Sequence, residues 1–164
     1  MSKRPEGQLS KTRNAVWWAL FLFPAILLQR FFPGVDFLLA GFLLTLQERR
    51  YADMPWVLPL LVILQEGMGT REFGVVLLWY MVVAAVFLLG RWLFDVDNFL
   101  YTILFSAALA VCYFAVAFLM SPLYAVPVDA HNLLDESAHL ALLLPVCWKL
   151  AQYTRRWAYA DDAE

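Results

Sequence analysis

Charged residues divide the chain into long apolar stretches. The uncharged segments are 14–29, 31–35, 37–47, 54–65, 73–90, 98–128 and 137–148. An α-helix that crosses a bilayer needs about 20 mostly apolar residues, a length that segments 73–90 and 98–128 meet. The pattern predicts an all-α membrane bundle of six transmembrane helices. The expected helices are about 14–30, 34–48, 54–67, 73–94, 98–120 and 133–153.

The second and third expected helices are short for spanning segments. They cross only where polar flanks reach the interface or where the bilayer thins. A re-entrant hairpin is the alternative, provided that protein shields its irregular backbone. The loop between the two helices contains Arg49 and Arg50, and two arginines at mid-membrane carry a large energetic penalty. The loop charges therefore favour two separate spans.

The basic residues predict the orientation, because cytoplasmic loops carry an excess of Lys and Arg. With six spans and the N-terminus inside, only Arg30 and Arg71 of the 12 Lys and Arg residues lie on the outer side. The inner set is Lys3, Arg4, Lys11, Arg13, Arg49, Arg50, Arg91, Lys149, Arg155 and Arg156. We therefore expect a basic cytoplasmic N-terminus (1–13), a transmembrane domain (14–153) and a cytoplasmic tail (154–164). Arg155 and Arg156 are expected at anionic lipid headgroups.

Composition supports a membrane protein. Hydrophobic residues make up 63% of the 164 residues and charged residues 16%, against about 25% charged in soluble domains. This composition excludes a disordered chain, a disulfide scaffold and a freely soluble enzyme. The net charge of −2 gives no basic footprint for nucleic acid. The expected partners are membrane lipids and other membrane proteins.

The segment QEGMGTREFG, from Gln65 to Gly74, joins the third and fourth expected helices on the outer side. Its glycines permit a tight turn or a close approach of helices. One interpretation is a structural corner or a partner surface, and the other is a helix-end carboxylate beside a solvated turn. In both, Glu66 and Arg71 are close enough along the chain to pair. The residues concerned are Glu66, Gly67, Gly69, Arg71 and Gly74.

A second polar segment, HNLLDESAHL, places three side chains on one face of a helix. His131, Asp135 and His139 are four residues apart, a spacing that neighbouring helical turns bring together. A metal site would need further strong ligands, which the sequence does not indicate, so we expect neither metal nor cofactor. The interpretation favoured is the start of an interfacial helix. Contact of Asp129, His131, Asp135 and His139 with an outer-face substrate or partner is the alternative.

Other polar residues have structural interpretations. Asp36 is expected at the N-terminus of the second helix. Hydrogen bonds between helices are expected of Gln47, Gln65, Thr102 and Ser106. The sequence contains no nucleophile–base pair, phosphate-binding loop or metalloprotease motif. We therefore expect a scaffold or a binding protein with no catalytic residues, and not an enzyme.

The segment LPLLVILQEGMGTREFGVVLLWYMVVAAVF, Leu58 to Phe87, resembles the MreD family of rod-shape-determining membrane proteins. The shared pattern is an apolar helix, an acid, a turn with glycine, a glycine eight residues after the acid, and a long apolar helix. Glu66 and Gly74 match the acid and that glycine, although the family more often has Asp at the first position. The aromatic-rich first helix is a second departure from the family pattern.

The resemblance implies a fold similar to the substrate-binding subunits of energy-coupling-factor vitamin transporters. It also implies a non-enzymatic scaffold in the bacterial inner membrane that acts in cell shape and lateral wall elongation. Its implied partners are MreC and the wall synthase of the rod complex. The alternative function is the substrate-binding subunit of a small-molecule importer. A membrane enzyme acting on lipids would need a polar cluster inside the bundle, which the sequence does not indicate.

Overall fold

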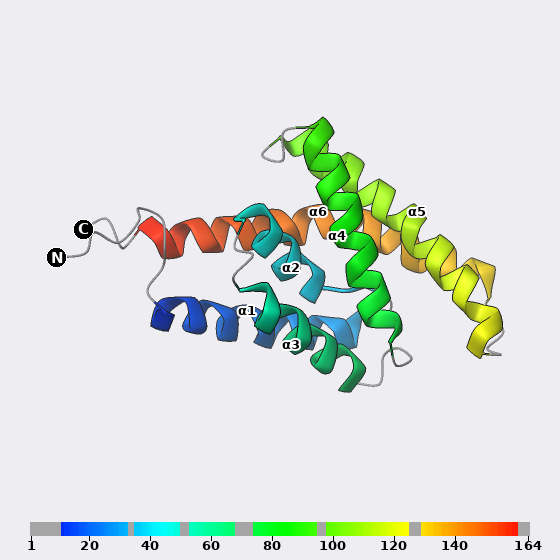
Figure 1. The fold of residues 1–164 in the computed structure, drawn as a ribbon, viewed down its shortest axis with the longest axis horizontal. Coiled ribbons are helices and arrows are strands. Elements are labelled where there is room, and N and C mark those ends of the chain that lie inside the picture. The colour runs from blue at the N-terminus through cyan, green and yellow to red at the C-terminus, as the bar shows by residue number, and fades with distance from the viewer. Residues whose placement is uncertain are drawn as a thin grey trace.

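The computed structural model describes residues 11–32, 35–49, 53–67, 74–94, 98–124 and 129–160. Throughout these ranges the regular structure is helical, which confirms the predicted all-α class. The six helices alternate with short connections along the chain (Figure 1). Their bounds are α1 (Lys11–Phe31), α2 (Leu38–Gln47), α3 (Met54–Gly67), α4 (Val75–Leu93), α5 (Phe99–Tyr124) and α6 (Ala130–Ala160).

Carboxylates fix where two of the helices begin. Asp36 Oδ1 accepts a hydrogen bond from Leu39 N at 3.0 Å, so α2 begins at Leu38 and not at the expected residue 34. Asp129 Oδ1 likewise accepts from His131 N at 3.0 Å. A side-chain oxygen in this place satisfies a first-turn N–H that has no partner inside the helix. The position of Asp36 at the N-terminus of α2 agrees with the expectation from sequence.

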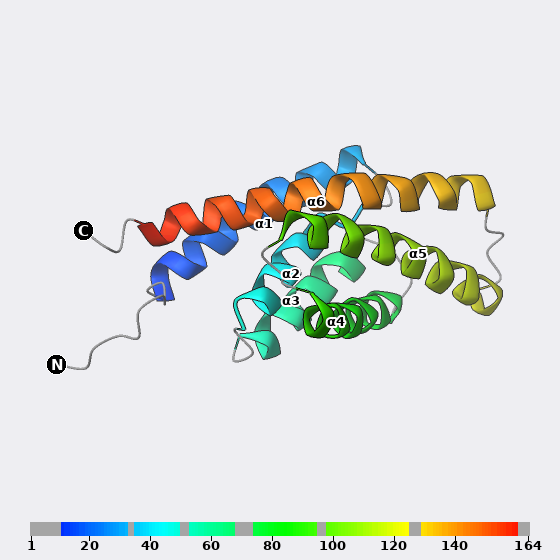
Figure 2. The ribbon, with the colours of Figure 1, turned by 90° about the horizontal axis from the view of Figure 1, so that it is seen from above.

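The central element is α2. All its residues from Leu38 to Leu46 are buried, and it packs against α1, α3, α4 and α6. Figure 2 shows α2 enclosed between α6 on one side and α3 and α4 on the other. A helix that is apolar on every side is stable only when it is buried, and the sequence of α2, LLAGFLLTLQ, has this property.

The outer helices are apolar on both faces. Large side chains such as Met81, Leu89, Val111 and Leu142 are exposed, while Trp79, Phe87, Leu109 and Trp148 face the core. Among the described residues, two segments, Val75–Leu93 and Phe99–Ser121, are long and apolar enough to cross a membrane. Apolar faces of this extent are typical of chains that contact lipid or protein there.

The α1 and α6 helices form an antiparallel pair along the long axis (Figure 1). Arg13 Nη2 in the first turn of α1 donates to the Ala158 carbonyl in the last turn of α6, at 2.6 Å. That carbonyl is one of the four that a helix C-terminus leaves without an internal partner. The bond lies beyond residue 153, where α6 was expected to end, because α6 continues to Ala160.

Candidate functional site

The end of α3 and the start of α4 are joined by one hydrogen bond. Glu66 Oε1 accepts from the backbone N–H of Gly74 at 2.8 Å. Glu66 is half-buried in the last turn of α3, and Gly74 directly precedes α4. A carboxylate at a helix N-terminus also interacts favourably with the helix dipole. The acid and the glycine eight residues later therefore meet in space.

Gly74 has a conformation that requires glycine. Its φ of +84° lies in the left-handed region, which costs an L-residue with a side chain about 1–2 kcal/mol. A Cβ built on Gly74 would meet nothing within 4 Å, so backbone strain, not crowding, excludes other residues. Gly67 has an ordinary φ and an equally open surrounding. Gly69 and Arg71 lie outside the described residues, and so does the expected pairing of Glu66 with Arg71.

The residue before Glu66 links the same corner to the core. Gln65 is 2% exposed, and its Nε2 donates to the Tyr80 hydroxyl at 3.4 Å. The Tyr80 ring lies 4.9 Å from the Phe42 ring of α2, in a T-shaped arrangement. The corner is therefore continuous with the packing around the central helix.

At the C-terminal end of α2, polar side chains from α2 and α6 form a cluster. Gln47 Oε1 accepts from Trp148 Nε1 at 3.1 Å and from Gln152 Nε2 at 2.6 Å. Glu48 forms a bidentate ion pair with Arg155, in which Nε and Nη2 lie 3.1 and 3.2 Å from the two carboxylate oxygens. We refer to these five residues as the α2–α6 cluster.

Arg155 does not lie at the lipid headgroups as expected. Its side chain is 4% exposed and that of Glu48 is 19% exposed. Its guanidinium also lies over the Trp17 ring of α1, 4.6 Å from the ring centroid, in a cation–π contact. Through its contacts with Glu48 and Trp17, Arg155 therefore joins α6 to the end of α2 and to α1. The neighbouring Arg156 is exposed, and its placement at lipid headgroups stays a prediction.

The expectation of a bundle without an internal polar cluster was therefore wrong. A signal for the cluster exists in α6, where buried positions recur with helical spacing. Leu133, Leu140, Leu144, Trp148 and Arg155 all lie on the buried stripe of this helix, as a period of 3.6 residues requires. Before Trp148 the buried polar residue is Ser137, whose hydroxyl donates to the Leu133 carbonyl within α6. After Trp148 the stripe includes the larger polar residues Gln152 and Arg155, and buried polar side chains of this size need partners.

The interhelical hydrogen bonds expected of four residues form for two of them. Gln47 and Gln65 bridge helices, as described above. Thr102 and Ser106 are buried, but their hydroxyls donate to the carbonyls of Asn98 and Thr102. These bonds satisfy the hydroxyls within α5 and its preceding residue, which short hydroxyl side chains do readily in helices.

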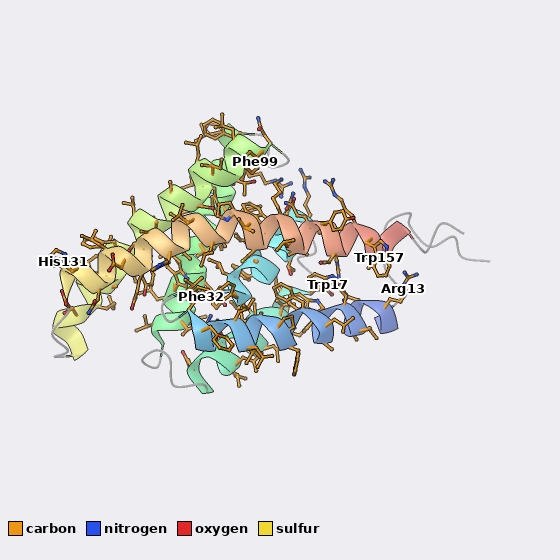
Figure 3. The ribbon with its side chains drawn as sticks, turned by 180° about the vertical axis from the view of Figure 1, so that it is seen from behind. Arg13, Trp17, Phe32, Phe99, His131 and Trp157 are labelled. Atoms are coloured by element: carbon orange, nitrogen blue, oxygen red, sulfur yellow. The ribbon has the colours of Figure 1, made fainter. Side chains whose placement is uncertain are left out.

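The predicted outer-face residues lie directly before α6, in the case of Asp129, and along the first turns of α6. Asp129, His131, Asp135 and His139 are all exposed, and His131 lies at the far end of α6 from Trp157 (Figure 3). Within the described ranges, no three His, Cys, Asp or Glu side chains gather to hold a metal ion. Nearby, the Tyr113 hydroxyl donates to Glu136 Oε2 at 2.7 Å and ties α5 to α6. Contact of the four exposed residues with a substrate or partner stays a prediction.

Comparison with known proteins gives no relative for the chain. No family model, no curated protein and no solved structure matches it.

Proposed function

We propose that this chain is an inner-membrane scaffold of the MreD type, which acts in bacterial cell shape and lateral wall elongation. Under this proposal it spans the membrane six times, with both termini in the cytoplasm. It performs no reaction itself. Its partners are other membrane proteins, an MreC-like protein and a wall synthase among them.

The observation that carries the proposal is the hydrogen bond between Glu66 and Gly74. The MreD resemblance depends on an acid and a glycine eight residues apart, and these two residues make contact at 2.8 Å. The glycine position is further restricted by a φ of +84°. A match in sequence alone does not require the two residues to touch, whereas Glu66 and Gly74 are hydrogen-bonded to each other.

The membrane placement has independent support. Two helices have the length and hydropathy of spanning segments, and ten of the 12 Lys and Arg residues lie on one side in a six-span topology. The short α2 is about 15 Å long by helical rise, half of a hydrocarbon core of about 30 Å. Because α2 is enclosed by other helices, the backbone at its two ends is shielded from lipid by protein. A helix shorter than the hydrocarbon core is tolerated in such a place.

The scaffold role is also supported by how the charged groups are engaged. Glu48 and Arg155 bind each other, and Glu66 binds a backbone amide. Through these contacts the carboxylates of Glu48 and Glu66 hold helices together. The importer alternative needs a polar outward-facing pocket, whereas the described outer residues Asp129, His131, Asp135 and His139 lie exposed on one helix.

Deletion of the gene from its native rod-shaped cell tests the proposal. We expect the cells to become round, and we expect plasmid-borne wild-type chain to restore rods. Glu66→Ala is expected to reach the membrane yet restore rods poorly, whereas the control Asn132→Ala, at an exposed residue outside the candidate set, restores them fully. Normal rods after clean deletion would contradict the scaffold role.

A pull-down from native membranes after cross-linking separates the two functions. The scaffold proposal expects an MreC-like protein and a wall synthase on the bait. Recovery of a pair of transport ATPases in their place would support the importer and overturn the scaffold.

A further inference from the structure

A groove of about 550 Å³ runs between α1 and α6. One stripe of each helix lines it, with Val16, Leu20 and Leu28 on α1 and Leu150 and Trp157 on α6. These five side chains are 40–69% exposed and form its rims. The buried Ala25 and Ala151 lie deeper, and their small size keeps the groove open.

The groove is chemically asymmetric. Among the described lining residues the cation is Arg13, in the first turn of α1, whose Nη2 donates to the Ala158 carbonyl. The exposed indole of Trp157 is at the same end, as Figure 3 shows. Among the described residues that line the groove there is neither Asp nor Glu, and the opposite end is formed by apolar side chains such as Leu28 and Phe37.

We propose that this groove binds one anionic phospholipid, with an acyl chain between α1 and α6 and the phosphate beside Arg13. The inference rests on the membrane placement proposed above and not on the role in cell shape. Charge complementarity selects this occupant: a cation and an indole mark the headgroup level, and the apolar remainder matches an acyl chain. An apolar helix of a partner would match the apolar part of the groove alone, whereas a phospholipid matches the apolar part and the basic end together.

The dimensions agree with this occupant. From Arg13 to Leu28 the groove follows α1 for about 22 Å by helical rise. One leaflet of the hydrocarbon core is about 15 Å deep. An acyl chain that begins at the Arg13 end is therefore enclosed along the whole depth of its leaflet. Basic pockets between membrane helices on the cytoplasmic side are known to select anionic headgroups, and Arg13 belongs to the inner set of basic residues.

Native mass spectrometry of the purified full chain in a neutral detergent tests the proposal. Phosphatidylglycerol is titrated against phosphatidylcholine with the same acyl chains. We expect one phosphatidylglycerol per chain, retained in preference to phosphatidylcholine. Arg13→Gln should weaken retention about fivefold, the effect of one cation near an anionic lipid. The matched control is Arg156→Gln, because Arg156 is exposed and does not line the groove.

Filling the groove provides a second arm. Thr154→Trp and Leu20→Trp place an indole in it from opposite sides, and both should abolish retention of either lipid. Tyr153→Trp is the control, since Tyr153 is 72% exposed and lies outside the lining. Far-UV circular dichroism in the same detergent shows that each variant keeps its helices.

Three outcomes would overturn the inference. They are equal retention of the two lipids, equal loss in Arg13→Gln and Arg156→Gln, and unchanged retention when the groove is filled. Normal rods after gene deletion, with phosphatidylglycerol still bound at one per chain, would reject the scaffold proposal and leave the lipid site standing.

Discussion

The tripeptide Leu-Gln-Glu occurs at the ends of two consecutive helices, at 46–48 and at 64–66, and the two copies make different contacts. At the first, Gln47 and Glu48 bind Trp148, Gln152 and Arg155 from α6. At the second, Gln65 binds Tyr80 of the next helix, and Glu66 binds the backbone of Gly74. The same three residues thus close a long-range contact at one end and a local turn at the other.

The difference lies in the burial and charge of the partner. Arg155 has a 4% exposed side chain beside an indole, so it stabilises the fold only while Glu48 compensates its charge. The partner of Glu66 is a neutral amide, and the bond between them is exposed to solvent. The first copy should therefore matter for global stability and the second for the shape of one corner.

Glu48→Gln should have the largest effect. It leaves the Arg155 charge buried without its carboxylate, and breaking a buried pair costs about 3 kcal/mol at the low end of the usual range. The low end applies because Glu48 is 19% exposed. The free energy of unfolding in mixed detergent micelles measures this loss. Arg156→Gln, the exposed control, should stay within about 0.5 kcal/mol of wild type.

The double variant Glu48→Leu with Arg155→Met sharpens this prediction. Replacing both members of a buried pair by apolar residues is often neutral, so the double variant should be more stable than Glu48→Gln. Equal losses in the single and double variants would mean that the pair contributes through packing and not through charge.

The two glutamines should differ next. Gln47→Leu removes the acceptor of two hydrogen bonds and leaves buried donors on Trp148 and Gln152, at a cost of about 2 kcal/mol. Gln65→Leu removes the long 3.4 Å bond to the Tyr80 hydroxyl, and should cost under about 1 kcal/mol. Thermal unfolding of the two variants in the same detergent gives the comparison. A larger loss of stability in Gln65→Leu than in Gln47→Leu would contradict the greater importance of the first Leu-Gln-Glu copy for stability.

At the corner, Gly74→Ala should cost about 1 kcal/mol because alanine is strained at positive φ. Gly67→Ala is the matched control: it also adds one methyl group in open space, and in a helix alanine is favoured over glycine. Both are measured by unfolding in micelles. Equal stability of the two variants would show that Gly74 is not held in the left-handed conformation.

Glu66→Gln should have the smallest effect on stability. The bond to Gly74 is exposed and loses only its charge assistance, so we expect about 0.5 kcal/mol. The amide exchange rate of Gly74, measured by hydrogen–deuterium exchange, is the more sensitive readout and should rise. An unchanged exchange rate would contradict the hydrogen bond from the Gly74 N–H to Glu66.

The contrast between the two copies also explains what the sequence predicts. The partner of Glu66 lies only eight residues away, inside the segment that the sequence had singled out. The resemblance paired Glu66 with Gly74, whereas the partner predicted from the residues themselves was Arg71. The partner of Glu48 lies 107 residues away, and no local pattern indicates which distant cation reaches it. Arg155 and Arg156 are adjacent in sequence, and only the tertiary position of α6 buries one and exposes the other. Helix positions followed from hydropathy, whereas their ends depended on Asp36, Asp129 and the Arg13 contact.

The membrane placement is tested most directly by cysteine accessibility in intact cells. In a background with Cys112 and Cys147 replaced by Ala, single variants Arg49→Cys, Arg156→Cys, Gly67→Cys and His131→Cys are treated with a membrane-impermeant maleimide. Gly67→Cys and His131→Cys should react in intact cells, and Arg49→Cys and Arg156→Cys only after the inner membrane is opened. Labelling of Arg49→Cys and Arg156→Cys from opposite sides would contradict six spans with both termini inside.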